Sequence, residues 1–278
     1  MQRIRMAVIG VGALGQHHAR ILSQQPDVEL VAVADANAAQ GTRVAARCGC
    51  RFVPDWTALT DRVDAVVIAV PTSLHAAIAC RFLASGVATL VEKPLAGSVS
   101  EAERIVAAAR EHGVPLQVGH IERFNPAAEV LGRLADPRHV LVRRCSPFPF
   151  RCLDVSVVAD VMIHDLDLLL TLTGQWPNTV SATGLAFTGE QLDVAHAHLE
   201  FPGGLKADVL ASRVDDRPTR TWELWTAGGR WRIDFQQRRV ESWCPTAVLA
   251  GDRPLARIAA NRTPDELRVL RDRFVGTY

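Results

Sequence analysis

The sequence predicts an α/β protein of two domains: a doubly wound parallel sheet at residues 1–121, then an α+β domain at 122–278 with an open, mostly antiparallel sheet. Up to about residue 120, short apolar runs alternate with helix-like segments, as in parallel α/β folds. Beyond Asn125, apolar residues recur at every second position in several long strands, which is typical of antiparallel sheets. A length of 278 residues also exceeds the usual size of one domain.

The composition favours a globular protein with a small-molecule partner. Hydrophobic residues make up 48% of the chain and charged residues 22%, far from the values of disordered proteins. The net charge of +1 and the lack of a Lys/Arg-rich window argue against nucleic acid as a partner. Apolar runs fall short of the roughly 20 residues that span a bilayer. The six cysteines form no C-x-x-C pair and are interpreted as reduced thiols, so we expect a cytoplasmic protein without a signal peptide or membrane partner.

The predicted elements of the first domain alternate along the chain. Its strands are residues 4–9, 30–34, 65–70, 89–91 and 116–119. Its helices are residues 14–24, an alanine-rich segment after Asp35, and residues 73–85 and 100–112.

The second domain shows one long helix and two hairpins. The helix is predicted over residues 158–173, because Gly174 is a typical C-terminal residue. Successive strands are predicted at residues 180–186, 194–201 and 205–212, the last two joined at Pro202-Gly203-Gly204. A second hairpin has apolar positions alternating on both sides of Gly228-Gly229.

A glycine-rich turn follows the first strand and opens the first helix. It reads Gly10-Val11-Gly12-Ala13-Leu14-Gly15, the G-x-G-x-x-G pattern of a Rossmann dinucleotide-binding domain. In such a turn Gly10 makes the tight bend, Gly12 admits the pyrophosphate and Gly15 lets the helix pack on the strand. The sequence therefore predicts a dinucleotide site that includes Ala13 and Leu14.

Asp35 closes the second strand, twenty residues after Gly15. A carboxylate there can accept hydrogen bonds from ribose hydroxyls and would repel a 2′-phosphate. Ala36 and Asn37 supply no compensating positive charge, so NAD is favoured over NADP. The alternative is that Asp35 only caps the following helix.

Three motifs follow successive strands of the first domain, and their order and spacing resemble the glucose-fructose oxidoreductase/inositol dehydrogenase (Gfo/Idh/MocA) family. They are Pro71-Thr72-Ser73-Leu74-His75, Glu92-Lys93-Pro94 and Arg123-Phe124-Asn125-Pro126. The resemblance covers nearly the whole chain. It implies an NAD-dependent dehydrogenase that acts on the CH-OH group of a sugar or cyclitol, and a homo-oligomer formed through the open sheet.

The segment at residues 119–126 is similar to one branch of that family, in which C3 of UDP-N-acetylglucosamine is oxidised for lipid A synthesis. Two alternatives stay open: a dehydrogenase of another sugar or cyclitol, and a noncatalytic NAD(H)-binding sensor or interaction protein. Family members usually continue beyond the point where this chain ends, so a truncated C-terminal element is also expected. The one tyrosine, Tyr278, argues against a tyrosine-based proton relay.

Lys93, Asp160 and His164 are the catalytic candidates. The chain contains two lysines against 29 arginines, so a lysine in this motif is informative, and an ammonium, unlike a guanidinium, can exchange its proton. Asp160 and His164 lie four apart on one helix and share a face; in the resembled family this pair points at the substrate. We expect His164, assisted by Asp160, to take the hydroxyl proton while Lys93 hydrogen-bonds the same oxygen, or the reverse. The alternatives are a surface lysine and an ordinary polar helix face.

The remaining site candidates come from the resemblance and from their place after strands. Cofactor contacts are expected from Pro71, Thr72, His75, Glu92 and Lys93, and substrate contacts from Lys93, Arg123, Asn125, Asp160 and His164. A capping and packing role is the alternative for the turn at Thr72. Further arginines that could pair with a diphosphate, or be solvated structural residues instead, are Arg143, Arg144 and Arg151.

A metal site in the second domain is a less favoured alternative. It is suggested by His196, His198 and Glu200, which alternate on one strand face. The open face of an antiparallel sheet often carries polar residues at this period. No metal is therefore expected.

Overall fold

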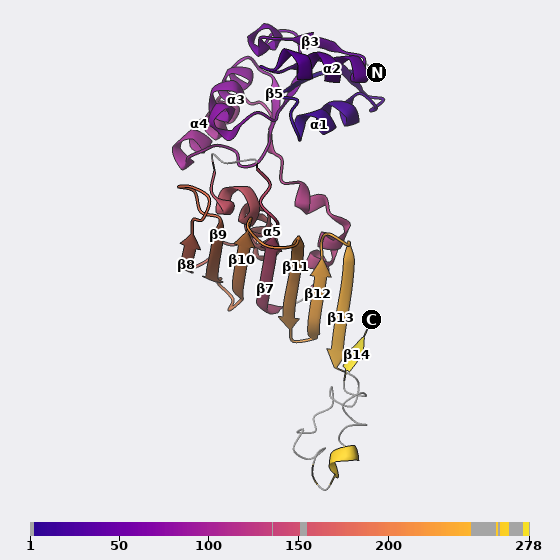
Figure 1. Ribbon diagram of the computed structural model, residues 1–278, viewed down its shortest axis with the longest axis vertical. Coiled ribbons are helices and arrows are strands. Elements are labelled where there is room, and N and C mark those ends of the chain that lie inside the picture. Colours follow the sequence, from indigo (N-terminus) through magenta and orange to yellow (C-terminus); the bar gives the residue numbers. More distant parts are fainter. Residues whose placement is uncertain are drawn as a thin grey trace. The chain divides into compact units, whose positions relative to one another are not determined.

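A computed structural model describes residues 3–134, 136–150, 155–245, 260, 262–266 and 275–277 (Figure 1). Contacts divide the chain into two compact units. The first runs to His120 and includes Val155, and the second begins at Ile121. In the part of the chain that the structure describes, no helix is long and apolar enough to cross a membrane.

The first unit is a six-stranded parallel sheet in the order β3-β2-β1-β4-β5-β6. Its strands are β1 (Ile4–Ile9), β2 (Val28–Ala34), β3 (Arg51–Val53), β4 (Ala65–Ile68), β5 (Ala88–Val91) and β6 (Leu116–Val118). Its helices are α1 (Gly15–Leu22), α2 (Ala38–Cys48), α3 (His75–Ala84) and α4 (Val99–Glu111), with the short 3-10 helices η1 (Trp56–Leu59) and η2 (Thr72–Leu74). The predicted doubly wound parallel sheet is confirmed.

Both faces of this sheet are buried, which explains why its strands are apolar at nearly every position. Ile9, Ile68 and Phe82 belong to the cluster that packs α3 and α4 on one face. Val8 and Val44 belong to the cluster that packs α1 and α2 on the other. The carboxyl ends of the strands, where the predicted motifs lie, are thereby held at one edge.

The second unit is an eight-stranded sheet in the order β14-β13-β12-β11-β7-β10-β9-β8 (Figure 1). Its strands are β7 (Pro137–Cys145), β8 (Thr179–Leu185), β9 (Val194–Glu200), β10 (Lys206–Ser212), β11 (Thr219–Thr226), β12 (Gly229–Asp234), β13 (Arg239–Pro245) and β14 (Val275–Thr277). Its helices are η3 (Ile121–Phe124), η4 (Pro126–Arg133), the π-helical η5 (Val158–Met162) and α5 (Ile163–Thr173).

The predicted open, mostly antiparallel sheet is confirmed, with one difference at its centre. The central strand β7 pairs antiparallel with β11 but parallel with β10. Side chains on one face of the sheet, among them Val142, Trp222 and Leu224, are fully buried against η4, η5 and α5. The helix that carries two of the catalytic candidates therefore lies on the core face of β7 and its neighbours.

A buried ionic cluster ties that helix to the sheet. Arg144 on β7 donates from Nε to Oδ2 of Asp165 at 2.6 Å and from Nη2 to Oδ1 at 3.0 Å. Oδ1 of Asp165 also accepts the indole N–H of Trp222 on β11 at 2.8 Å. Nη2 of Arg144 reaches Oε2 of Glu122 on η3 at 3.3 Å. Arg144 is 4% exposed, Asp165 1% and Trp222 0%, so these polar groups have been taken out of water.

A buried charge costs several kcal/mol unless it is paired and hydrogen-bonded. Both oxygens of Asp165 have donors, and the guanidinium of Arg144 meets two carboxylates. Two strands, β7 and β11, therefore converge on Asp165 of α5, and η3 joins the cluster through Arg144. Because Asp165 directly follows His164, the cluster fixes the backbone from which the His164 side chain projects.

We predict that Arg144→Met lowers the free energy of unfolding by about 3–5 kcal/mol, because it leaves a buried carboxylate with one donor group fewer. The measurement is urea unfolding followed by tryptophan fluorescence. Arg143→Met is the matched control: this neighbour is exposed and its Nη2 lies 3.7 Å from the nearest oxygen of Asp215, so it should cost about 0–1 kcal/mol. Equal losses in the two variants would show that the cluster does not hold the unit together.

Candidate functional site

The glycine-rich turn is shaped by close backbone approach at two of its glycines and by open space at the third. Gly10 has a φ of +81°, and a Cβ there would lie 2.7 Å from the carbonyl oxygen of Ala69. A Cβ on Gly15 would lie 1.8 Å from the carbonyl oxygen of Gly10. A Cβ on Gly12 would meet no atom within 4 Å. The roles expected of Gly10 and Gly15 are therefore steric, and the space beside Gly12 fits a close-lying pyrophosphate.

The N-terminus of α1 offers donors next to that space. Within the described residues, Leu14 is the N-cap and supplies no side-chain hydrogen bond, and the first turn holds no acidic residue. Unsatisfied N–H groups at a helix N-terminus attract phosphate. Gly12, Ala13 and Leu14 are all exposed, so their backbone is accessible to a ligand.

Asp35 lies at the end of β2 and binds the glycine-rich turn. Its Oδ2 accepts the backbone N–H of Val11 at 2.7 Å, and its Oδ1 accepts that of Asn37 at 2.8 Å. The N-cap of α2 is Asn37, whose side chain accepts from Gln40, so the alternative that Asp35 itself caps the helix is wrong. A carboxylate has further lone pairs, and ribose recognition by Asp35 stays a prediction.

The turn after β4 is organised by a buried histidine. His75 is 1% exposed; its Nδ1 lies 2.9 Å from the carbonyl oxygen of Pro94 and its Nε2 lies 3.0 Å from that of Val70. In the described structure Pro71 is the N-cap of η2 without a side-chain cap bond, and Thr72 is 9% exposed. His75 thus bridges the backbones that follow β4 and β5, and its contact with a cofactor stays a prediction.

The turn after β5 presents Lys93 beside a buried carboxylate. Glu92 is 6% exposed, and its Oε1 lies 2.7 Å from Nε2 of His18 on α1. Its Oε2 accepts the backbone N–H of Lys93 at 3.2 Å. Lys93 is half-buried, and its peptide bond to Pro94 is cis. His18 was not singled out from the sequence, because a contact between residues 74 apart leaves no pattern in one sequence.

Asp160 and His164 lie where a π-helical turn passes into α5. Asp160 belongs to η5 and is 7% exposed, whereas His164 is the second residue of α5 and is half-buried. A π-turn is wider than an α-turn and advances by a smaller angle per residue, so side chains four apart are brought closer to alignment. Gly174 ends the helix in the left-handed conformation at a φ of +63°, as predicted. The two side chains therefore project from one face of a helix that the Arg144 cluster holds.

Arg123 and Asn125 both bind groups of their own unit. Arg123 donates from Nε to Oδ2 of Asp167 at 2.7 Å and from Nη2 to Oδ1 at 2.5 Å, which raises the pKa of its guanidinium. Its side chain is 49% exposed. Asn125 caps η4 by accepting the N–H of Ala127 and donates to the carbonyl oxygen of Phe235 at 2.9 Å. Arg123 can still offer N–H groups to a ligand, whereas the amide of Asn125 is engaged on both sides.

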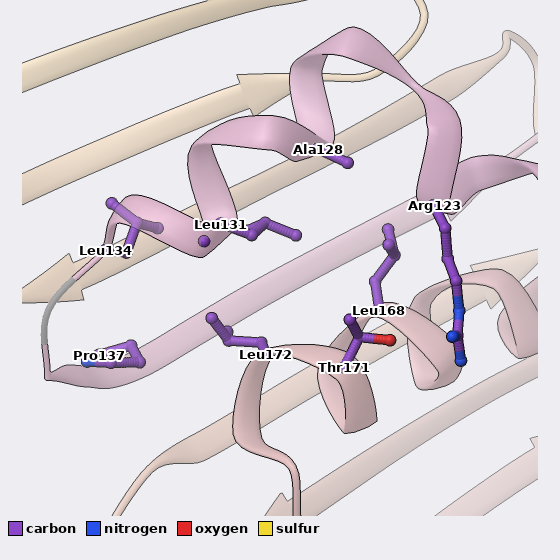
Figure 2. Close-up of a pocket in the computed structure, with 9 residues that line it drawn as sticks. Arg123, Ala128, Leu131, Leu134, Pro137, Leu168, Thr171 and Leu172 are labelled. Carbon is purple, nitrogen blue, oxygen red and sulfur yellow. The ribbon is translucent and has the colours of Figure 1, made fainter.

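A pocket of about 270 Å³ lies beside Arg123, between η4 and α5 (Figure 2). Apart from Arg123 and Thr171 its lining is apolar: Ala128, Leu131, Gly132, Leu134, Pro137, Leu168 and Leu172. A sugar nucleotide needs many polar partners, and this lining offers two polar side chains, Arg123 and Thr171. The pocket therefore does not have the chemistry of the predicted substrate site.

The polar residues on the open sheet face pair with one another. Nδ1 of His198 lies 2.8 Å from Oδ1 of Asp208, which raises the pKa of His198, and Glu200 accepts a bond from Lys206 at 2.8 Å. Nε2 of His196 lies 3.8 Å from the same Asp208 oxygen. Among the described residues no group of three or more His, Cys, Asp or Glu side chains could hold a metal ion.

The predicted site residues fall into two sets. The first unit carries the glycine-rich turn, Asp35 and the turns after β4 and β5, and the second carries Arg123, Asn125, Asp160 and His164. Of the further arginines, Arg144 is buried in its cluster, so neither a ligand contact nor a solvated role describes it, and Arg143 is exposed near Asp215. Arg151 lies outside the described residues.

We predict opposite behaviour for two glycines of the turn. Gly15→Ala should lower the free energy of unfolding by about 2–3 kcal/mol, because its Cβ overlaps a backbone oxygen. Gly12→Ala should leave stability within about 0.5 kcal/mol of the parent but weaken NADH binding about tenfold or more, since its methyl group takes space proposed for the pyrophosphate. Calorimetry and fluorescence titration with NADH measure the two effects. Gly189→Ala, where a Cβ also meets no atom within 4 Å, should change neither; NADH affinity unchanged in Gly12→Ala would refute the assignment.

Family models match both parts of the chain. The model of an oxidoreductase family with an NAD-binding Rossmann fold, Gfo/Idh/MocA, matches residues 4–120, and the model of the Gfo/Idh/MocA C-terminal domain matches residues 132–232. The chain is 39% identical over 237 residues to a UDP-N-acetylglucosamine 3-dehydrogenase of Acidithiobacillus ferrooxidans, covering 84% of this chain and 75% of the relative. A crystal structure of the A. ferrooxidans enzyme aligns with a TM-score of 0.82 at 37% identity, over 88% of this chain and 80% of that one. A scyllo-inositol 2-dehydrogenase (NAD(+)) of Bacillus subtilis is 31% identical over 235 residues, covering 76% of this chain and 68% of the relative. The chain belongs to the Gfo/Idh/MocA family and is an NAD-dependent dehydrogenase acting on CH-OH groups.

Proposed function

We propose that this dehydrogenase oxidises the C3 hydroxyl of UDP-N-acetylglucosamine to the 3-keto sugar nucleotide, as a step toward lipid A. The observation that carries the proposal is the 39% identity over 237 residues with a UDP-N-acetylglucosamine 3-dehydrogenase. Inositol dehydrogenases are 31% identical over similar lengths. The sequence at residues 119–126, which contains Arg123 and Asn125, supports the same branch.

The first unit suits NAD. The space beside Gly12, the uncapped N-terminus of α1 and the carboxylate of Asp35 at the end of β2 lie where a dinucleotide needs room, an anion site and a ribose partner. When bound, NAD⁺ accepts the hydride that leaves C3. Asp35 would repel a 2′-phosphate, so the proposal includes preference for NAD over NADP.

The chain itself must move the hydroxyl proton. The hydride carries the electron pair of the C3–H bond to the cofactor, and the electron pair of the O–H bond becomes the second bond of the carbonyl, so one proton is released. In the proposal His164 accepts this proton, and Asp160 orients the imidazole. Lys93 hydrogen-bonds the same oxygen and stabilises its developing negative charge. The opposite assignment of Lys93 and His164 satisfies the same balance.

Arg123 is the proposed contact for the negatively charged part of the substrate. Its side chain is half-exposed although two of its N–H groups are bound to Asp167. The ion pair fixes the plane of the guanidinium, and its other N–H groups can bind an anion without first losing side-chain freedom.

The proposal also covers assembly and location. The open face of the large sheet mixes paired charges with Trp225 and Trp243, over both of which the guanidinium of Arg230 stacks. A second copy of the chain could cover such a face, and we propose a homo-oligomer formed there. The described cysteines are free thiols, which is consistent with a cytoplasmic enzyme that does not bind nucleic acid or membranes.

A substrate panel tests the proposed activity. The purified protein is incubated with NAD and, separately, with UDP-N-acetylglucosamine, other UDP-sugars, myo-inositol, scyllo-inositol and free sugars. We expect NADH absorbance and a keto product 2 Da lighter than the substrate with UDP-N-acetylglucosamine. Turnover of a cyclitol or free sugar alone would favour the second candidate function, a dehydrogenase of another sugar or cyclitol. The similarity to inositol dehydrogenases supports this candidate. NADH binding without any turnover would contradict both.

We predict that Lys93→Met and His164→Ala each lower kcat by at least about 100-fold, the usual range for loss of a positioned acid or base. NADH affinity should stay within about threefold of the parent. Arg110→Met and His112→Ala are matched controls, because both side chains are exposed and lie outside the proposed site. Near-normal turnover in both site variants would remove the catalytic assignment.

A further inference from the structure

Glu92 is a buried carboxylate to which the proposed reaction assigns no proton-transfer step. It lies one residue before Lys93, at the carboxyl end of β5, and its side chain is 8% exposed. The proton leaves through Lys93 or His164 in the scheme above, so Glu92 has no step of its own. A charge kept this far from water, next to a catalytic candidate, calls for a physical explanation.

The partner of this carboxylate is His18. Nε2 of His18 lies 2.7 Å from Oε1 of Glu92, within hydrogen-bond distance, and the imidazole is 24% exposed. His18 lies three residues after Gly15, in the first turn of α1, so the contact joins the helix of the dinucleotide turn to the turn that carries Lys93. A short hydrogen bond to a carboxylate in a site with little water fixes both side chains.

The second oxygen of the carboxylate bonds to the catalytic turn itself. Oε2 of Glu92 accepts the backbone N–H of Lys93 at 3.2 Å. With Oε1 held by His18, the carboxylate plane is fixed, and the N–H of Lys93 has one favoured direction. The backbone direction at Lys93 determines where its ammonium group can reach.

Gly119, at the end of the neighbouring strand β6, leaves room for this arrangement. A Cβ at this position would lie 2.9 Å from Oε2 and 3.0 Å from Cδ of Glu92, closer than such contacts allow. The φ of Gly119 is not in the left-handed region, so a side chain at this position would conflict with the present place of the Glu92 carboxylate and not with the backbone conformation. Three segments, α1, the end of β5 and the end of β6, therefore meet at one carboxylate.

We propose that His18 is a positioning residue of the dehydrogenase: acting through Glu92, and with the space left by Gly119, it holds the backbone of Lys93 so that the ammonium meets the reacting oxygen. The inference rests on the proposed catalytic role of Lys93. It assigns a function to His18 and Gly119, neither of which contacts substrate in this scheme.

The first test replaces the imidazole. His18→Ala removes the donor to Oε1 and should lower kcat about 10- to 100-fold, the cost of a small misplacement of a catalytic group. The Kd for NADH should stay close to that of the parent, while the thermal midpoint falls by a few degrees, because the buried carboxylate of Glu92 loses one donor. In His18→Gln the amide can donate to the same oxygen, and at least half of the lost log kcat should return.

The second test displaces the carboxylate without touching His18 or any charge. Gly119→Ala places a methyl group against Oε2, and only the end of a flexible side chain has to move. It should reproduce the fall in kcat seen in His18→Ala. Gly189→Ala is the matched control, because a Cβ there meets no atom within 4 Å. The double variant His18→Ala/Gly119→Ala should be no slower than the worse single variant, since both act through one carboxylate.

The outcomes separate this inference from the proposed function. Normal kcat in His18→Ala and Gly119→Ala, while Lys93→Met is inactive, would overturn the positioning role and leave the function intact. A loss of NADH affinity as large as the loss of kcat, with no recovery of kcat in His18→Gln, would also overturn it, because it indicates a merely structural contact. Normal turnover of Lys93→Met would overturn the catalytic assignment and this inference together.

Discussion

A carboxylate can be buried only if cations and N–H groups satisfy its oxygens, and this constraint organises both units of the protein. In the second unit Asp165 is 1% exposed and is held by Arg144 and Trp222, so β7, β11 and α5 must meet in one arrangement. In the first unit Glu92 fulfils the same condition with His18 and the backbone of Lys93. Each of these carboxylates is next in sequence to a catalytic candidate. The buried carboxylate therefore fixes the backbone from which the side chain of Lys93 or His164 extends.

Backbone geometry supplies the rest of the site. At Gly10 and Gly15 the chain passes so close to itself that a methyl group has no room, while at Gly12 the space is open. Asp35 reinforces this turn by accepting the N–H of Val11. His75 bridges two carbonyl oxygens from the turns after β4 and β5. The residues expected to touch the cofactor therefore also shape the loops around it, and a substitution at Asp35 or His75 would affect both roles.

Much of the fold could be predicted because periodicity and glycine position report local structure directly. The first strand has the predicted bounds, and the long helix of the second unit ends at Gly174 as expected. Four strands, β3, β7, β13 and β14, were not predicted, and for two of them the physical reason is clear. β3 has three residues, too few for a period to show. β7 is interrupted on its buried side by Arg144, a charged residue in the core whose compensation comes from residues distant in sequence.

The site was predictable where a motif has a local cause and not where distant residues meet. The glycine-rich turn follows from strand, turn and helix in order, and the helix predicted up to Gly174 contains both Asp160 and His164. Neither the contact of His18 with Glu92, 74 residues apart, nor that of Arg123 with Asp167, 44 apart, leaves a pattern in one sequence. The π-turn at Asp160 was likewise hidden, because its residues fit an ordinary helix equally well.

The central claim is that a hydride leaves C3 of the sugar nucleotide, and an isotope label tests it most directly. UDP-N-acetylglucosamine deuterated at C3 is incubated with the enzyme and NAD, and the reduced cofactor is analysed by mass spectrometry. The account predicts that the deuterium appears in the reduced cofactor, one mass unit above NADH, with slower turnover than the unlabelled substrate. Reduced cofactor without deuterium, while the label stays in the sugar, would show that another carbon is oxidised and would contradict the account.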